Sequence, residues 1–307
     1  MDKELIKNQV SVIIATYKRA DLVVRAVESA LQQTCDTDVI VIDDNGKDTP
    51  EQLETAEVLR PYNDRITYLV NETNLGPSGT RNHGIQHASG EFITFLDDDD
   101  EIKTEKLEKQ MNCLNEKGED YSICYCDYTK LLENASTYLN GETIEGDVYP
   151  YMLGRMVFVG SGSNILVRTK VLLEVGLFNE ALRRYEDFEL MCRLLKNHKL
   201  AYLPENLFTI HYEVRAIVPP FSEIQKYDHD YYEIVSDEIE KLSEKQKKLI
   251  KQSASLMLWR LSLSYLSKKD SFQILKDNHV PVTLFIRYLI YLVDRLRTKR
   301  SYGFKPF

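Results

Sequence analysis

Short apolar runs alternate with amphipathic stretches along the first hundred residues of the chain. Residues 10–15 and 38–42 are nearly continuous runs of β-favouring side chains, which is typical of strands buried on both faces of a parallel sheet. Residues 20–33, between these runs, place their apolar side chains on one helical stripe. The alternation continues with a helix at 50–60, a strand at 66–70, a helix at 77–88 and a strand at 92–96. Four strand–loop–helix units predict an α/β fold built on a doubly wound, mostly parallel sheet.

The pattern changes beyond residue 100. A helix at 103–116 and a strand at 121–128 precede a polar, irregular stretch. The apolar run at 157–168 contains glycines and small polar residues, which would let a substrate approach the backbone but would equally suit a bulge. From about residue 219 helical patterns dominate, and they cover 222–242, 244–267 and 282–297. We therefore divide the chain into a domain at 1–218 and a C-terminal helical region at 219–307.

The last of these helices is strongly apolar on one side, where Phe285, Leu289, Leu292 and Leu296 share a stripe. Charged residues interrupt it, so it is not the run of about 20 apolar residues that a membrane span requires. Its basic end fits a helix that lies on an anionic membrane surface through residues 280–300. Packing against its own domain or against a second subunit explains the stripe equally well.

The composition is that of a globular protein, with 43% hydrophobic and 28% charged residues. The charge is divided unevenly. Residues 241–307 hold 15 Lys and Arg against 4 Asp and Glu, which is +11, so the net charge of −9 leaves −20 on residues 1–240. The acidic body argues against nucleic acid as its partner, whereas the basic tail could meet anionic lipid, nucleic acid or the acidic body of another copy in a homo-oligomer. Scattered cysteines and a charged start without an apolar signal segment favour a cytoplasmic protein.

Four consecutive carboxylates, Asp97 to Asp100, follow the strand at 92–96. Packed together they repel one another, so a cation or open water has to compensate. Clustered carboxylate oxygens suit Mg²⁺ or Mn²⁺, which proteins hold through one or two carboxylates and substrate phosphates. A solvated acidic turn is the alternative for such a run taken alone.

Other polar clusters fall at the same edge of the predicted sheet. They are Thr16–Tyr17, Asp43–Asp44 and residues 74–81, and each follows a strand or opens a helix. In doubly wound sheets ligands bind beyond the carboxyl ends of the strands, which favours a binding site here over a solvated surface. The segment from Gly76 starts a helix and offers backbone amides to an anion, and Arg81 lies one turn further on. The chain has neither the glycine fingerprint of dinucleotide-binding folds nor a P-loop.

Four ordered motifs, at 10–19, 41–45, 74–82 and 90–100, resemble glycosyltransferase family 2. The resemblance covers about residues 9–215. It implies a GT-A fold, a nucleotide-diphosphate-sugar donor, a divalent metal such as Mg²⁺ or Mn²⁺, and transfer with inversion at the sugar.

The resemblance also implies roles for residues of the first half. Tyr17 would lie against the base, and Asp44 would accept a hydrogen bond from a base imide, which favours a UDP-sugar. Arg81 would approach the ribose or the diphosphate, and Asp99 would bind the metal. Six further residues are expected near the nucleotide, namely Ala15, Asp43, Asn74, Gly76, Asp97 and Asp98. Asp100 would be only a helix-start acid.

In the second half, Glu186 and Asp187 open a predicted helix, where acids are favoured for structural reasons alone. The family pattern has a Glu–Asp at this place, which implies that Asp187 is the base taking the acceptor proton. Glu186 would orient the acceptor or support Arg184. The family's closing segment resembles residues 207–212 loosely, and it implies that His211 is a metal or diphosphate ligand and that Arg215 neutralises charge.

We therefore expect a metal-dependent inverting glycosyltransferase that moves a sugar to a hydroxyl of a glycan or lipid-linked saccharide acceptor. The resemblance suggests cell-surface polysaccharide synthesis, such as capsule or O-antigen, on the inner face of the cytoplasmic membrane. A sugar-phosphate nucleotidyltransferase and a non-catalytic nucleotide-sugar binding protein are the alternatives. The sequence does not identify the sugar, the acceptor or the oligomeric state.

Overall fold

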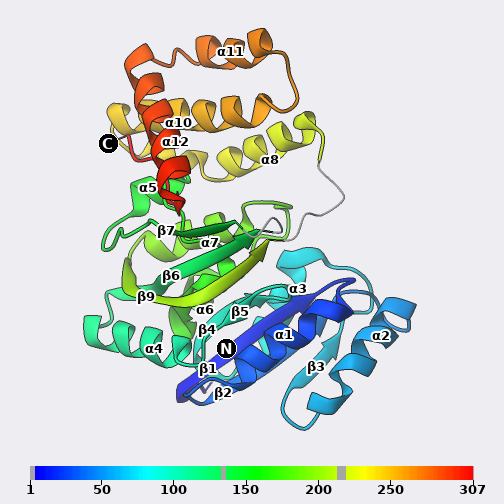
Figure 1. Ribbon diagram of the computed structural model, residues 1–307. Coiled ribbons are helices and arrows are strands. Elements are labelled where there is room, and N and C mark those ends of the chain that lie inside the picture. The colour runs from blue at the N-terminus through cyan, green and yellow to red at the C-terminus, as the bar shows by residue number, and fades with distance from the viewer. Residues whose placement is uncertain (1–3, 133–135, 213–218, 307) are drawn as a thin grey trace.

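A computed structural model describes residues 4–132, 136–212 and 219–306. They form one large mixed sheet with helices on both faces and a helical layer at one end, where the C-terminal helices lie (Figure 1). The strands follow the order β10-β7-β6-β8-β4-β1-β2-β3, while β9 pairs with β6 and β5 pairs with β9. This architecture confirms the predicted α/β class with a C-terminal helical region.

The half of the sheet formed by the first four strands is parallel. Its strands are β1 (Ile6–Thr16), β2 (Thr37–Asp43), β3 (Thr67–Val70) and β4 (Gly90–Asp97). They follow the apolar runs read from the sequence, because strands buried on both faces need apolar side chains on both. In register, Ala15 lies between Ile42 of β2 and Asp97 of β4, so all three strands deliver their polar ends to the same edge.

The second half of the sheet is mixed. The antiparallel strand β8 (Leu166–Arg168) links β4 to β6 (Tyr121–Leu132), and β9 (Lys199–Tyr212) runs parallel to β6. Short strands complete the sheet, namely β5 (Glu101–Ile102), β7 (Thr137–Asn140) and β10 (Arg300–Ser301). The stretch after residue 130, which we expected to be irregular, therefore contributes β7 and accepts the chain's C-terminal strand. Hydrogen bonds to other strands order this polar segment.

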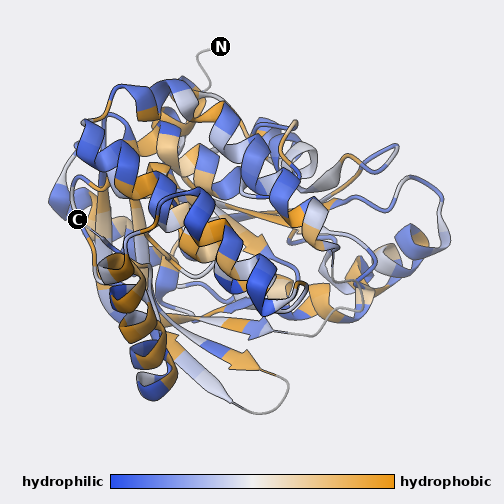
Figure 2. Cartoon of the chain, turned by 90° about the horizontal axis from the view of Figure 1, so that it is seen from above, coloured by the Kyte–Doolittle hydropathy of each residue, from blue (hydrophilic) through white to orange (hydrophobic). Residues whose placement is uncertain are grey.

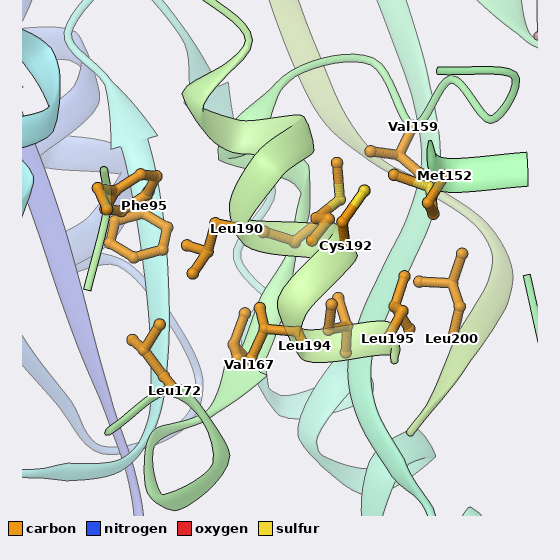
Figure 3. Packing of buried hydrophobic residues seen from close by; sticks show 14 of the residues in the cluster. Phe95, Met152, Val159, Val167, Leu172, Leu190, Cys192, Leu194, Leu195 and Leu200 are labelled. Carbon is orange, nitrogen blue, oxygen red and sulfur yellow. The ribbon is translucent and has the colours of Figure 1, made fainter. Parts of the chain in front are cut away.

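Helices cover the two faces of the sheet. Against one face pack α1 (Ala20–Leu31) and α4 (Lys106–Lys117), whose apolar stripes meet alternate residues of β1 and β2. The other face receives α3 (Gly76–His87), α6 (Thr169–Val175) and α7 (Glu186–Leu195), together with the short α5 (Tyr149–Leu153). Figure 3 shows this second core, where Leu190 and Leu194 of α7 face Phe95 of β4 and Val167 of β8. Helix α2 (Pro50–Leu59) packs beside α1.

One glycine fixes the height of α3 above the sheet. A Cβ on Gly84 would lie 2.5 Å from a methyl of Ile13 and 2.7 Å from Ile42, so only glycine lets the helix come this close. The close approach matters because α3 begins at the edge where the polar strand ends gather.

The C-terminal region contains α8 (Phe221–Ile234), α9 (Ser236–Glu240), α10 (Glu244–Ser262), α11 (Lys268–Asp277) and α12 (Val282–Thr298). The predicted helix at 222–242 is thus divided in two, and α11 was not predicted. Tyr231 and Ile250 belong to the same core as α7, so this region shares a core with the sheet in addition to its own cluster around Trp259. Every helix among the described residues is too short or too polar to cross a bilayer.

Candidate active site

A cavity of about 460 Å³ opens at the carboxyl ends of β1, β2 and β4. Nine residues that the sequence pointed to line it: Ala15, Tyr17, Asp44, Asn74, Gly76, Arg81, Asp97, Asp98 and Asp99. Four more lining residues were not singled out as site residues, namely Thr16, Arg19, Pro77 and Thr80. The strand register brings these residues together, because neighbouring parallel strands have their carboxyl ends at the same edge of the sheet. Tyr17 is 44% exposed, so its ring is open to contact with a ligand.

The two aspartates at the end of β2 face different surroundings. Asp43 is fully buried and does not line the cavity; its carboxylate accepts from the hydroxyl of Tyr68 at 2.7 Å and from the amide of Asn45 at 2.8 Å. Burial raises the pKa of Asp43, which these hydrogen bonds oppose. Asp43 is therefore placed to hold the β2 exit loop, away from a ligand in the cavity.

Asp44 lines the cavity but is already bonded to the α3 entry loop. Its carboxylate accepts from the amides of Leu75 at 2.7 Å and Gly76 at 3.0 Å, and from the side chain of Asn71 at 2.7 Å. The Gly76 amide, the first of those that we expected to be offered to an anion, is thus used by Asp44. A carboxylate has about four acceptor positions, so one remains for a ligand donor.

Arg81 stands between the two halves of the sheet. One terminal nitrogen donates to Asp97 at 2.9 Å, and the other donates to Glu186 at 3.0 Å. Burial alone would lower the pKa of Arg81, but the two carboxylates raise it. Glu186 is therefore paired with Arg81 of α3 instead of its neighbour Arg184.

The acidic run divides into two groups. Carboxylate oxygens of Asp97, Asp99 and Asp100 lie within 4.8 Å of one another, whereas Asp98 turns to Arg19. Arg19 also donates to Asp99 at 3.1 Å, and Arg25 donates to the Asp99 backbone carbonyl. Sequence reasoning missed both arginines, although Arg19 closes the first motif, because a pairing across β1 and β4 is visible only in three dimensions.

His211 is near this group but does not join it. Its backbone amide donates to Asp100 at 3.2 Å, and its Nε2 lies 3.6 Å from a carboxylate oxygen of Glu101. Among the described residues, the carboxylate oxygens that converge come from three aspartates without the imidazole. Arg215 lies outside the described residues.

The loop at 160–164 connects the acidic run to α7. The hydroxyl of Ser163 accepts from the Asp97 amide at 3.0 Å, and the hydroxyl of Ser161 donates to Asp100 at 3.5 Å. A Cβ on Gly162 would lie 3.9 Å from the Cβ of Asp187, so the loop passes directly beside that carboxylate. The small residues in this apolar run therefore serve close packing at the site.

Asp187 lies in the first turn of α7, after a residue in an unusual conformation. Tyr185 adopts a left-handed backbone with φ of 67°, which is uncommon for a bulky residue and needs outside support. The Arg155 guanidinium provides it, since its centre lies 4.0 Å from the Tyr185 ring centroid while Arg155 also pairs with Asp228 of α8. The C-terminal region thus helps set the start of α7.

The Asp187 carboxyl is tuned by its neighbours. Burial raises its pKa to about 6, and the charges of Glu186 and Asp97 add to this effect, while the Phe188 amide and Arg81 oppose it. A carboxyl with such a pKa is deprotonated at neutral pH, yet it is a better proton acceptor than an ordinary aspartate. The raised pKa suits the general-base role expected of Asp187, and that role stays a prediction.

Comparisons with known proteins agree with this geometry. The sequence profile described as "Glycosyl transferase family 2" matches residues 11–176, which is more than half of the chain. The chain belongs to glycosyl transferase family 2.

Two curated relatives and one solved structure illustrate the family's range. The chain is 36% identical over 177 residues to a "GalNAc(5)-diNAcBac-PP-undecaprenol beta-1,3-glucosyltransferase" of Campylobacter jejuni, covering 56% of this chain and 55% of that one. It is 25% identical over 280 residues to the "Putative colanic acid biosynthesis glycosyl transferase WcaA" of Escherichia coli, covering 85% and 94%. The structure of S. aureus TarS 1-349 with UDP-GlcNAc superposes with a TM-score of 0.57 at 16% identity over 97% and 94% of the chains. Some curated relatives are longer, and the chain spans 31% of the length of two of them.

The residues of the acidic run fit a divalent metal. Burial raises the pKa of Asp100 well above its usual range, and the nearby charges of Asp97 and Asp99 contribute. Three converging carboxylates that repel one another form an oxygen-rich donor set, with Arg19 on Asp99 and Arg81 on Asp97 at its border. Such a set suits a hard divalent ion. The expectation of a divalent metal at the acidic run is therefore supported, with Asp100 in the group where a helix-start role was expected.

Proposed function

We propose that this enzyme transfers a sugar from a UDP-sugar to a hydroxyl of a saccharide acceptor, with inversion at the anomeric carbon. One observation carries the proposal: Arg81 joins Asp97, at the nucleotide edge, to Glu186, next to the candidate base Asp187. Donor groups and a proton acceptor therefore meet at one place. Family membership favours this activity over a nucleotidyltransferase or a binding protein without catalysis.

The donor side rests on the cavity at the strand ends. Tyr17 offers an exposed ring to a base, and Asp44 retains one acceptor position for an imide. Arg81 and Arg19 supply positive charge near a diphosphate. A divalent ion held by Asp97, Asp99 and Asp100 would, when bound, neutralise charge on the leaving diphosphate. TarS, which is crystallised with UDP-GlcNAc, has the same fold, and this supports a UDP-sugar.

The transfer is a single displacement. The acceptor oxygen forms a bond to the anomeric carbon while the bond from that carbon to the diphosphate oxygen breaks, and its electron pair leaves with UDP. Asp187 takes the proton of the acceptor hydroxyl, and Arg81 keeps the neighbouring Glu186 from carrying an unbalanced charge. Asp187 is a general base in this scheme, and Glu186 is a positioning residue.

We propose a lipid-linked or glycan acceptor in the synthesis of a cell-surface polysaccharide. The names of the Campylobacter and Escherichia relatives, which refer to an undecaprenol-linked saccharide and to colanic acid, support this class. A lipid-linked acceptor would be met at the inner face of the cytoplasmic membrane. The enzyme would dock there through α12, whose residues Val282, Ile290 and Val293 are 71%, 64% and 62% exposed.

The charge at the end of α12 favours an anionic membrane over a second subunit. Arg297, Lys299 and Arg300 are exposed at the C-terminal end of the same helix, where the apolar face ends. Basic residues beside an apolar helical face match anionic headgroups above an acyl layer. In Figure 2 this helix is largely orange and lies at the outside of the molecule, near the C-terminus.

A product assay tests the transfer. Purified protein is screened against nucleotide sugars with Mn²⁺ by thermal shift, and the stabilising donor is then incubated with a lipid-linked disaccharide. We expect release of UDP and no pyrophosphate. Asp187→Asn should bind the donor like the wild type and lose transfer by about a hundredfold or more. Release of pyrophosphate would establish a nucleotidyltransferase, and full transfer by Asp187→Asn would remove Asp187 as the base.

A further inference from the structure

A second cavity, of about 570 Å³, lies between the mixed half of the sheet and the C-terminal helices. Three cationic side chains line it, namely Lys130 of β6, Arg260 of α10 and Arg295 of α12. Its described lining includes no aspartate or glutamate. Apart from Ser301, the remaining wall is apolar or aromatic, with Leu292 and Leu296 among its residues. The cavity therefore combines positive charge with an apolar surface.

These cations have no carboxylate partner among the described residues. The Lys130 ammonium lies 4.2 Å from the Tyr212 ring centroid, and Arg295 donates to the hydroxyls of Tyr291 at 2.8 Å and Ser301 at 3.2 Å. Burial and the charge of Arg295 lower the pKa of Lys130. In a chain of net charge −9, gathering like charges in one cavity costs free energy unless an anion occupies it.

A smaller cavity of about 190 Å³ shares Arg260 and Arg295 with the larger one. Ser253 and Tyr288 line it, and each is only 1% exposed. Their hydroxyl oxygens have no hydrogen-bond partner in the described part of the chain. Unpaired buried hydroxyls cost about 1–3 kcal/mol each. Ligand oxygens beside the two arginines would satisfy them.

The apolar part of the cavity continues onto the protein surface. Leu296 lines the cavity and is also 68% exposed, so it stands at the mouth. Val293 and Ile290 extend the apolar face from there along α12, at 62% and 64% exposure. A ligand with an anionic head and a long apolar chain would fit this continuous path.

The cavity also adjoins the acidic edge of the active site. Tyr212, on its wall, follows His211, whose backbone amide donates to Asp100 at 3.2 Å. The charge of Asp100 also acts on Lys130. A headgroup in the cavity would therefore lie near the acidic run, on the side where Asp100 contacts the end of β9.

We infer that this cavity binds the diphosphate head of the lipid that carries the acceptor saccharide, with Lys130, Arg260 and Arg295 as its ligands. The lipid chain then runs out past Leu296 over the apolar face of α12. This assignment deepens the proposed function and rests on its lipid-linked acceptor. It separates the acceptor's anionic head from the donor cavity, which lies at the ends of β1, β2 and β4.

Farnesyl diphosphate serves as the probe, with the full chain and calorimetric titration in EDTA. The chelator keeps metal from recruiting a diphosphate to the acidic run. We expect binding that UDP does not displace, and weaker binding of inorganic pyrophosphate and of farnesol alone. Arg260→Glu should weaken farnesyl diphosphate binding about tenfold or more, since a charge-assisted contact is lost and a repulsive charge is added. Arg260 has no hydrogen-bond or ion-pair partner among the described residues, so the variant should fold.

Lys248→Glu is the matched control, because Lys248 is exposed on the same helix and the change in net charge is identical. It should leave farnesyl diphosphate binding unchanged. Equal weakening by both variants, displacement of the probe by UDP, or pyrophosphate binding as tight as the lipid diphosphate would overturn the assignment. UDP binding and donor turnover are measured separately on both variants, so a failure of the proposed transfer is distinguished from a failure of this cavity.

Discussion

Arg81 donates to Glu186 at 3.0 Å across the boundary between the two halves of the sheet. The same guanidinium donates to Asp97 at 2.9 Å, so one side chain from α3 ties the acidic edge of β4 to the start of α7. These three residues lie at 81, 97 and 186, and only the packing of α3 and α7 on one face of the sheet brings them together. The pairing therefore holds the residues of the donor-sugar cavity at a set distance from the candidate base Asp187.

Removal of this guanidinium should destabilise the fold. Arg81→Ala leaves the carboxylates of Asp97 and Glu186, whose side chains are 33% and 14% exposed, without this counter-charge, and we expect the free energy of unfolding to fall by about 2–4 kcal/mol in urea. Arg60→Ala is the control, because Arg60 pairs with Glu57 with both side chains mostly exposed. That change should cost about 0.5 kcal/mol or less. Similar losses for the two variants would show that the Arg81 pairing contributes little.

The pH dependence of transfer should report Asp187. Since burial raises its pKa to about 6 and a general base acts deprotonated, kcat/KM should rise with pH through about 6 and level off above it. Burial also raises the pKa of Asp98 to about 6, so this rising limb of the pH profile has to be assigned to one of the two residues. Glu186→Gln removes a negative neighbour of Asp187, which should move the limb to lower pH.

The control for that profile is Glu205→Gln, which changes an exposed carboxylate and should leave the limb in place. A limb that stays unmoved in Glu186→Gln would mean that Asp187 does not titrate there. In that case Asp98 would be the group to test.

Metal binding should depend on Asp100 as well as Asp99. At about a hundred times its Kd, Mn²⁺ should raise the melting temperature by about 2–5 °C, because ligand bound only to the native state adds about 2.7 kcal/mol. Asp100→Asn and Asp99→Asn should each reduce this shift. Asp98→Asn should retain it, since Asp98 pairs with Arg19. If Asp100→Asn responds to Mn²⁺ like the wild type, Asp100 is a structural acid as the sequence suggested.

The apolar face of α12 should decide membrane docking. The double change Ile290→Glu and Val293→Glu alters exposed positions, so the melting temperature should hold, while binding to vesicles with phosphatidylglycerol should weaken about tenfold or more. Leu53→Glu, on the exposed surface of α2, should leave vesicle binding unchanged. Loss of an oligomer in place of vesicle binding would identify the face as a subunit contact.

Point substitutions test membrane docking by α12 better than removal of the helix does. Leu284 and Tyr288 of α12 are buried in the cluster around Trp259, and Lys305 beyond it pairs with the buried Glu142 at 2.7 Å. A truncated chain would therefore lose part of its core. Its failure to bind vesicles would report on folding.

The sequence by itself determined the fold class and most of the donor cavity. Apolar runs such as residues 10–15 need burial on both faces, and parallel strands end at one edge, so Tyr17, Asp44 and Asp97 had to come close together. The end of each strand could be predicted because the apolar run gives way to polar residues there. The motifs at these strand ends also predicted the family, which the match over residues 11–176 confirms.

Only the tertiary structure decided which polar groups pair. It assigned Arg19 to Asp98, Arg81 to Glu186 and Asp44 to the α3 entry loop, since partners distant in sequence are chosen by packing. It also showed which side of α12 is buried, because a helical stripe fixes an apolar face but not the surface it meets. Of the predicted stripe, Leu289 and Leu296 are exposed, whereas Phe285 and Leu292 pack against the cluster that contains Leu284 and Tyr288.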